Sequence, residues 1–227
     1  RLPPSALHWG LPVLESRISL IQDGALYYRG INACDLATRH TFEDVARFLW
    51  TGALTRQPQP QTRLIRPVPT IPAGRLMARM AAALLELPSA ADHMSIVHTL
   101  LRAVAPARHH QSAAVLQHAY TPGLPDARPL FDTLLILCAD HELNVSSFTA
   151  RCVASARTDL CMAVLAGLCA LTGELHGGHS DRVLTFLNSI RAPAQVSAAC
   201  RAAQRRAGRL PGFGHALYPN GDPRAAT

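Results

Sequence analysis

The chain has 227 residues, 48% of them hydrophobic and 5% aromatic, and a formal net charge of +7. Alanine and leucine must fill the core, which favours close-packed helices over a sheet rich in valine, isoleucine and tyrosine, so we expect an all-α fold. No charge-free run reaches the roughly 18 residues that span a bilayer, and the N-terminus lacks the pattern of a signal peptide. We therefore expect no membrane association and a soluble, cytoplasmic protein.

Strict two-residue alternation occurs only near Ile18 to Leu26, so strand content should be minimal. The apolar spacing of Thr41 to Thr51 predicts a short amphipathic helix, with Thr41 and Asp44 as a capping box and Gly52 as the stop. A proline-bearing loop should follow. Helical spacing then predicts helices over 73–87, 89–103 with Ser89 and Asp92 at its start, 107–120, 130–139, 159–171, 181–190 and 193–206.

The segment Asp159 to Leu171 is apolar on nearly every face. A helix of this kind should be buried all round, either in the core or between subunits. After it, Gly177 and Gly178 break the helical pattern.

The basic charge has two interpretations, because a basic protein can bind nucleic acid or can present a solvated basic helix face. Here the arginines are spread along the chain and are densest only at Arg201, Arg205, Arg206 and Arg209. We expect a solvated face there, with the phosphate groups of a coenzyme as the alternative ligand. Nucleic-acid binding has no recognisable motif in this region.

The six cysteines contain no Cys-x-x-Cys pair, and several fall within apolar helical runs. They are expected to be reduced core residues of a cytosolic protein. The six are Cys34, Cys138, Cys152, Cys161, Cys169 and Cys200.

Three histidines lie in short polar and glycine-containing blocks that are not typical of core packing. Histidine exchanges a proton near neutral pH, arginine grips carboxylates through a planar fork, and glycine lets a substrate approach the backbone. The combination predicts a site for a small polyanion and enolate or carbonyl chemistry. The blocks are Ala139-Asp140-His141-Glu142-Leu143-Asn144, Glu174-Leu175-His176-Gly177-Gly178, and Gly212-Phe213-Gly214-His215 followed by Asp222-Pro223-Arg224.

At these residues the chain resembles the citrate synthase family, including the methylcitrate synthases. The resemblance covers nearly the whole chain, and its blocks occur in the family's order at compatible spacings. Besides the histidine blocks, it rests on Gly24-Ala25-Leu26-Tyr27-Tyr28-Arg29-Gly30-Ile31, Asp35-Leu36-Ala37, Thr41-Phe42-Glu43-Asp44-Val45-Ala46 and Asp222-Pro223-Arg224-Ala225.

The resemblance implies a mostly helical, two-domain homodimer whose site is completed by an arginine of the partner subunit. Residues 1–178 would form the large helical domain, and residues 179–227 the N-terminal portion of a small one. In the family, the catalytic acid, the remaining carboxylate-binding arginines and much of the coenzyme A site lie beyond the Asp-Pro-Arg block. We therefore expect this chain alone to be inactive.

The resemblance also implies roles for individual residues. His176 would stabilise the enol or enolate oxygen of acetyl-CoA, as a neutral donor near a helix start, and His215 would polarise the keto group of oxaloacetate. Arg224 would pair with a carboxylate of oxaloacetate, and His141 would bind the same substrate. Residues in support are Asn144, Gly177 and Gly178, and the role expected of Tyr28-Arg29-Gly30 is architectural.

Each block also has a purely structural interpretation. A His-Gly-Gly sequence alone is often a structural turn, and Asp-His-Glu at a helix end is often a satisfied polar cluster. The pair His176 and His179 with Asp181 has spacing for a metal site, but the intervening glycines favour a turn, so we expect no metal. Glu174 and His179-Ser180-Asp181 depart from the usual family residues, which puts the neighbouring coenzyme contacts in doubt.

The leading hypothesis is an acyltransferase that condenses acetyl-CoA, or another short acyl-CoA, with oxaloacetate to give citrate and CoA. It needs acetyl-CoA as a substrate and no metal or redox cofactor. The alternative hypothesis is a non-catalytic, metabolite-sensing protein built on a truncated domain of this type. The start at Arg1-Leu2-Pro3-Pro4 also leaves room for an additional N-terminal domain. The sequence does not separate a citrate synthase from a methylcitrate synthase.

Overall fold

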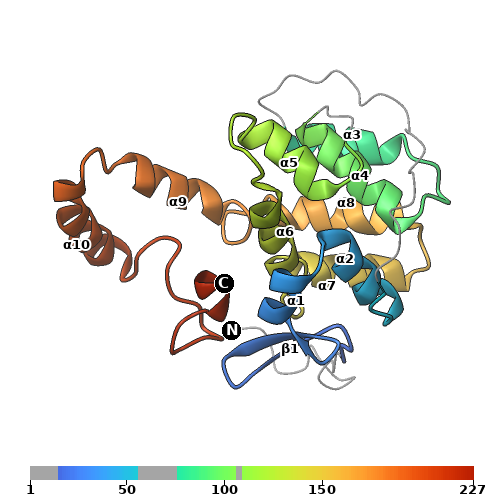
Figure 1. The fold of residues 1–227 in the computed structure, drawn as a ribbon, viewed down its shortest axis with the longest axis horizontal. Helices are drawn as coiled ribbons and strands as arrows, with labels where there is room; N and C mark the ends of the chain where they lie inside the picture. Colours follow the sequence, from blue (N-terminus) through green and yellow to red (C-terminus); the bar gives the residue numbers. More distant parts are fainter. Residues whose placement is uncertain (1–14, 56–75, 106–108) are drawn as a thin grey trace, which may run out of the picture.

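The computed structural model describes residues 15–55, 76–105 and 109–227. Within these ranges a small antiparallel sheet is followed by ten α-helices, so the all-α prediction is confirmed (Figure 1). The predicted loop at 57–72 lies outside the described residues, as do the first residues of the helices predicted from 73 and 107.

The alternating segment near residue 20 forms a hairpin with a short third strand. Strand β1 (Ser19–Gln22) pairs with β2 (Ala25–Tyr28), which pairs with β3 (Ile31–Asn32), all antiparallel and in chain order. Ser19 is opposite Tyr28 in this register. The minimal strand content is as predicted.

The helices follow the sheet along the rest of the described chain (Figure 1). Two of them, α1 and α7, are not among the predicted helices, because α1 is short and α7 contains serine, threonine and valine residues of modest helix propensity. The bounds are α1 Ala33–Arg39, α2 Phe42–Thr51, α3 Leu76–Leu85, α4 His93–Val104, α5 Ser112–Tyr120, α6 Arg128–Leu137, α7 Val145–Ser155, α8 Leu160–Leu171, α9 His179–Asn188 and α10 Val196–Ala207.

Helix α2 has the predicted ends. Thr41 is its N-cap and accepts a hydrogen bond from the Asp44 backbone N–H at 3.3 Å. Gly52 ends the helix in the left-handed region with φ of 80°, which a residue with a Cβ adopts at a cost. Local capping chemistry thus determines this element.

The capping prediction for α4 is wrong in one respect. Asp92, not Ser89, is the N-cap, and its Oδ1 accepts from the Ser95 N–H at 3.0 Å. The carboxylate also accepts from the Ser95 hydroxyl at 2.6 Å. Aspartate and serine are both good N-caps, so the sequence pattern alone favours the earlier of the two.

Farther along the chain, Pro193 opens a 3-10 turn that leads into α10, as expected.

The two larger of the three apolar clusters among the described residues hold most of the helical body together. One joins the hairpin, α1, α2 and α6, and includes the fully buried Leu26, Tyr28, Val45 and Ile136. The other joins α3, α4 and α8. The first cluster matters for the site, because it fixes the end of α6 against the hairpin.

Helix α8 is not buried all round within this chain, so the core interpretation is wrong. Of its residues only Cys161 and Ala163 are buried, while Leu160 and Met162 are each 38% exposed. Burial between subunits stays a prediction.

The cysteines are free, as expected of reduced thiols, but most are not core residues. Only Cys161 is buried, and Cys138, Cys152 and Cys169 are exposed. Among the described helices, none is both long enough and apolar enough to cross a membrane.

Helices α9 and α10 project from the helical body, and the terminal segment then turns back toward α1 and α6 (Figure 1). The return is marked by a contact of 3.9 Å between Sγ of Cys34 and the carbonyl oxygen of Pro223. A last 3-10 turn, Pro223–Ala226, ends the chain. This return places His215 and Arg224 near the end of α6.

Candidate functional site

The loop that carries His141 is fastened to the hairpin. The buried Tyr28 hydroxyl lies 2.8 Å from the carbonyl oxygen of Ile136 and 3.0 Å from that of Asp140, at the end of α6. The Ser19 hydroxyl, on the facing strand, donates to Oδ2 of Asp140 at 2.6 Å. Because the loop is held from two strands, the position of His141 follows from the hairpin register.

Two further features define this loop. The Glu142 backbone N–H donates to the Ser19 hydroxyl at 3.0 Å, and Glu142 has φ of 54°, an uncommon conformation for a residue with a side chain. Burial raises the pKa of the Asp140 carboxyl, against the opposing effect of its hydrogen bond from Ser19. The Asp140 carboxylate and the Glu142 backbone N–H thus both fasten the loop to Ser19.

Arg29 supports the fold from the other side of the hairpin. Its guanidinium donates to the carbonyl oxygen of Leu49 from Nε at 2.9 Å and from Nη2 at 2.6 Å, near the end of α2. Together with the contacts of Tyr28, these bonds support the architectural role expected of Tyr28-Arg29-Gly30 at its first two residues.

His141 and His215 come together around Tyr218. The two imidazole rings meet edge to face with centroids 4.8 Å apart. Nε2 of His141 lies 3.0 Å from the Tyr218 hydroxyl, and the Tyr218 ring centroid is 5.4 Å from that of His215. Tyr218 is 2% exposed and was not singled out from the sequence, where a tyrosine three residues after the histidine has no distinct signal.

Arg224 joins the same group. Its guanidinium carbon lies 5.6 Å from the Tyr218 ring centroid, within the range of a cation–π contact. Asp222 holds the guanidinium through a fork, with Nε to Oδ1 at 2.9 Å and Nη2 to Oδ2 at 2.6 Å. The structure therefore brings together three of the four predicted substrate and catalytic side chains.

The electrostatics favour a neutral imidazole beside a fixed cation. Burial lowers the pKa of His141, and the nearby Arg224 and His215 lower it further. The hydrogen bond with Asp222 raises the pKa of Arg224, so the guanidinium stays charged. Burial raises the pKa of Tyr218, which keeps its hydroxyl protonated at neutral pH. A neutral imidazole beside a charged guanidinium can bind an anion that also carries a polarisable carbonyl.

The environment of His215 selects one tautomer. Its Nδ1 accepts a hydrogen bond from the Leu217 backbone N–H at 3.2 Å. A neutral imidazole that accepts at Nδ1 carries its proton on Nε2. His215 is exposed, so this proton is available to a ligand.

His176 lies in the turn before α9 and contacts a different element. Its Nε2 is 2.9 Å from the hydroxyl of Ser146, in the first turn of α7. That hydroxyl donates to Oδ1 of Asn144 at 2.8 Å, and the same oxygen caps α7 by accepting from the Ser147 N–H at 3.0 Å. Asn144 is thus connected through Ser146 to His176. Ser146 was not identified from the sequence, because a serine after a helix cap is common.

Close packing requires glycine at the first position after His176 and leaves little room for a side chain at the second. A Cβ on Gly177 would lie 2.3 Å from the carbonyl oxygen of Leu171, and one on Gly178 would lie 3.0 Å from that of Gly173. The chain can make this turn only with glycine at the first position.

The structure records two neighbouring groups connected by the 141–146 segment: His141, His215 and Arg224 around Tyr218, and His176 with Ser146 and Asn144. No described group of three or more histidine, cysteine, aspartate or glutamate side chains could hold a metal ion.

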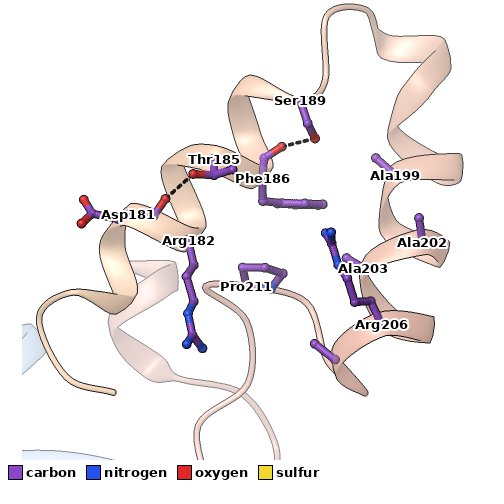
Figure 2. Close-up of a pocket in the computed structure, with 11 residues that line it drawn as sticks. Asp181, Arg182, Thr185, Phe186, Ser189, Ala199, Ala202, Ala203, Arg206 and Pro211 are labelled. Carbon is purple, nitrogen blue, oxygen red and sulfur yellow. Dashed lines mark hydrogen bonds between the residues drawn. The ribbon is translucent and has the colours of Figure 1, made fainter. Parts of the chain in front are cut away.

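A separate hollow of about 650 Å³ lies between α9 and α10. Figure 2 shows Phe186, Arg206 and Pro211 facing one another across it. None of the seven predicted site residues lines this hollow. It is therefore not the site formed by the histidines.

The sequence matches a known family over nearly its whole length. The model of the family described as citrate synthase, C-terminal domain matches residues 6–123 and 109–227. A 2-methylcitrate synthase of Mycobacterium tuberculosis is 29% identical over an alignment of 263 positions that covers 96% of this chain and 66% of that protein. A citrate synthase of Mycolicibacterium smegmatis is 29% identical over 96% of this chain and 70% of its own length. The chain thus spans about two thirds of the length of these relatives.

Solved structures share the fold. A citrate synthase from Pyrobaculum aerophilum superposes with a TM-score of 0.77 at 25% identity, covering 95% of this chain and 67% of that one. Another, from Thermoplasma acidophilum, was solved with carboxymethyl coenzyme A and oxaloacetate, and superposes with a TM-score of 0.74 at 21% identity over 95% of this chain and 68% of that one. Because the family model matches well over half of the sequence, the chain belongs to the citrate synthase family.

Proposed function

We propose that this chain provides the 2-oxo acid site and the enolate-stabilising histidine of an acyltransferase that condenses acetyl-CoA, or another short acyl-CoA, with oxaloacetate. The products are citrate, or its alkyl homologue, and CoA. The observation that carries the proposal is the convergence of His141, His215 and Arg224 on Tyr218, where two imidazoles and a guanidinium face one small region. Acetyl-CoA is a substrate, and the reaction needs no metal or redox cofactor.

The 2-oxo acid binds through charge and a directed proton. Arg224 pairs with one carboxylate through the guanidinium N–H groups that Asp222 leaves free, since Asp222 already occupies Nε and one N–H of Nη2. His215 donates its Nε2–H to the keto oxygen, which increases the positive charge on the carbonyl carbon that the enolate attacks. Neutral His141 adds a hydrogen bond without adding a charge.

The acyl group is activated at His176. As the acyl methyl group loses a proton, negative charge develops on the thioester oxygen, and the His176 imidazole donates a hydrogen bond to it. This donation uses Nδ1, and it requires the Ser146 hydroxyl, 2.9 Å from Nε2, to donate to that nitrogen in place of Oδ1 of Asn144. Water then hydrolyses the condensed thioester and releases CoA. The base that removes the proton belongs to the part of the family's site that the resemblance places beyond Arg224.

Relatives named for two different acyl substrates match equally well. The 2-methylcitrate synthase and the citrate synthase cited above are both 29% identical to this chain. The length of the acyl chain that the enzyme accepts must therefore be measured. The Thermoplasma acidophilum protein, crystallised with a coenzyme A analogue and oxaloacetate, supports the general substrate pair.

We also propose a cytoplasmic homodimer, with residues 179–227 as the start of a second domain. The exposed side chains of Leu160 and Met162 on the apolar helix α8 support a subunit interface, since water contact with this face is unfavourable.

The test is a thiol-release assay on the product of the complete reading frame. With oxaloacetate present, acetyl-CoA and propionyl-CoA are each supplied in turn, and free CoA is measured with a thiol reagent. Oxaloacetate-dependent CoA release supports the proposal, and the larger kcat/KM identifies the acyl substrate. No release above the rate without oxaloacetate, by a protein that is folded, contradicts it.

A further inference from the structure

Tyr218 is the common neighbour of the site's three polar side chains. Its hydroxyl contacts His141, its ring adjoins that of His215, and Arg224 lies over its ring. We propose that Tyr218 is a positioning residue: its hydroxyl fixes the ring orientation and tautomer of His141, and thereby sets the affinity for the dicarboxylate. The identity of the ligand in this inference rests on the proposed function, whereas the contact between Tyr218 and His141 does not.

Tyr218 is anchored in a way that its neighbours are not. It is 2% exposed, whereas the adjacent Leu217 is 44% exposed. Its backbone N–H donates to the carbonyl oxygen of His215 at 2.9 Å, and its own carbonyl accepts from Gly221 at 3.1 Å. The backbone of this segment therefore directs the tyrosine inward and leaves His215 exposed.

The hydroxyl meets a defined atom of His141. Nε2 lies 3.0 Å away, which is within hydrogen-bond distance. The Tyr218 hydroxyl can donate to Nε2 or accept from it, and whichever role it takes leaves the opposite role to Nδ1, so the direction of this one hydrogen bond sets the tautomer of His141. The tyrosine thereby prepares one hydrogen-bonding face of His141 for a ligand.

The ring of Tyr218 has a second role that the hydroxyl does not share. The Arg224 guanidinium lies 5.6 Å from the ring centroid, where the aromatic face attracts a cation. Asp222 holds the same guanidinium at its edge. A change from tyrosine to phenylalanine keeps the ring beneath Arg224 and removes only the contact with His141.

The first variant is therefore Tyr218→Phe, made in the product of the complete reading frame. Its matched control is Tyr120→Phe, because Tyr120 is 62% exposed on α5. Oxaloacetate affinity is measured by calorimetry for each protein. Loss of a hydrogen bond that orients a buried polar group predicts about tenfold weaker binding for Tyr218→Phe, and no change for the control.

Two measurements distinguish a Tyr218 that orients His141 from a Tyr218 that only fills space. The first is the pair of ¹⁵N shifts of the His141 ring, assigned with a His141→Gln variant and recorded without ligand. One tautomer should dominate in the parent, and the two should mix in Tyr218→Phe. The second is a double-mutant cycle. If Tyr218 acts through His141, its substitution should no longer weaken binding when His141 is already alanine.

The proposal is overturned if folded Tyr218→Phe keeps both the oxaloacetate affinity and the His141 tautomer of the parent. It is also overturned if the effect on affinity is undiminished in the His141→Ala background, because Tyr218 then acts independently of His141. Failure of the proposed function has a different signature, in which the parent itself does not bind oxaloacetate. The ¹⁵N shifts would still determine whether Tyr218 orients His141.

Discussion

The rings of His141 and His215 meet edge to face with centroids 4.8 Å apart. His141 follows α6, whereas His215 belongs to the segment that returns to the helical body after α10 (Figure 1). Their meeting depends on that return, so the cluster of His141, His215 and Arg224 exists only when the terminal segment is docked. Substitutions in either segment should affect the same ligand.

His176→Ala should lower kcat by about 100-fold in the protein expressed from its complete reading frame. One donor to a developing oxyanion contributes mainly in the transition state, so the KM for the acyl-CoA should change little. Ser146→Ala should lower kcat in the same direction by about tenfold, because it leaves the His176 ring without its partner. Steady-state CoA release measures both.

The control for these variants is Ser155→Ala. Ser155 is on the same helix α7, but its hydroxyl donates to the carbonyl oxygen of Cys152 at an exposed site. It should keep the parent kcat. A near-parent kcat in His176→Ala would contradict the role of this histidine.

Arg224→Ala should chiefly raise the KM for oxaloacetate, by about 10- to 100-fold, because the ion pair with the carboxylate already exists in the ground state. The matched control is Arg128→Ala, which removes an arginine paired with Asp126 on the surface. A fall in kcat with unchanged KM would show that Arg224 acts in the chemical step and not in binding.

Where local chemistry determines an element, the sequence was sufficient to predict it. Thr41 and Gly52 delimit α2 as expected, since both act within one turn. Burial is different, because it depends on which surfaces meet. The periodicity of Asp159 to Leu171 predicts a helix, but it contains no information on which neighbour covers Leu160 and Met162.

The residues of the candidate site likewise divide into those that the sequence identifies and those that only the fold identifies. His141, His176, His215 and Arg224 stand out because histidine and arginine beside glycine or acidic residues are chemically distinctive. Tyr218 and Ser146 do not stand out, since their importance arises from distances of 3.0 Å and 2.9 Å to side chains far away in the sequence. Only the fold brings these partners together.

Tyr28→Phe should destabilise the protein by about 1–3 kcal/mol. The hydroxyl is buried between the carbonyl oxygens of Ile136 and Asp140, and its loss removes the side-chain partner of both at the end of α6, although the Ile136 carbonyl keeps its bond from the Ala139 N–H. The control is Tyr27→Phe on the same strand, in a less buried position, where a change within about 0.5 kcal/mol is expected. Urea unfolding with an unchanged m-value measures both, and equal midpoints would contradict the prediction.

Stability should fall as the pH falls below about 6.5. Burial lowers the pKa of His98 from the ordinary value of 6.5, although the nearby Glu43 opposes the shift. Between the folded and unfolded pKa values, the unfolded chain binds more protons, so acid favours unfolding; above 6.5 this penalty is absent. His141, whose pKa is also lowered, acts in the same direction.

His98→Leu should reduce the slope of the unfolding free energy against pH between about pH 5 and 7, by at most about 1.4 kcal/mol per pH unit. His118→Leu is the control, because His118 is exposed on α5 and should leave the slope unchanged. Denaturant titrations at several pH values give the slope. A parent protein with constant stability from pH 7 to 5 would contradict the lowered pKa assigned to the half-buried His98.

The pocket should select a dianion over a monoanion. His141, His215 and Arg224 converge on one region, and a monoanion offers their hydrogen-bond donors one carboxylate fewer to pair with. Oxaloacetate should therefore bind better than pyruvate, and His215→Ala should narrow the difference, because it weakens the contact with the keto group and the adjacent carboxylate. Calorimetric titration of both acids into the parent and the variant gives the four affinities. The control is His118→Leu, which should keep the parent ratio; equal affinity of the parent for the two acids would mean that these residues do not form a dicarboxylate site.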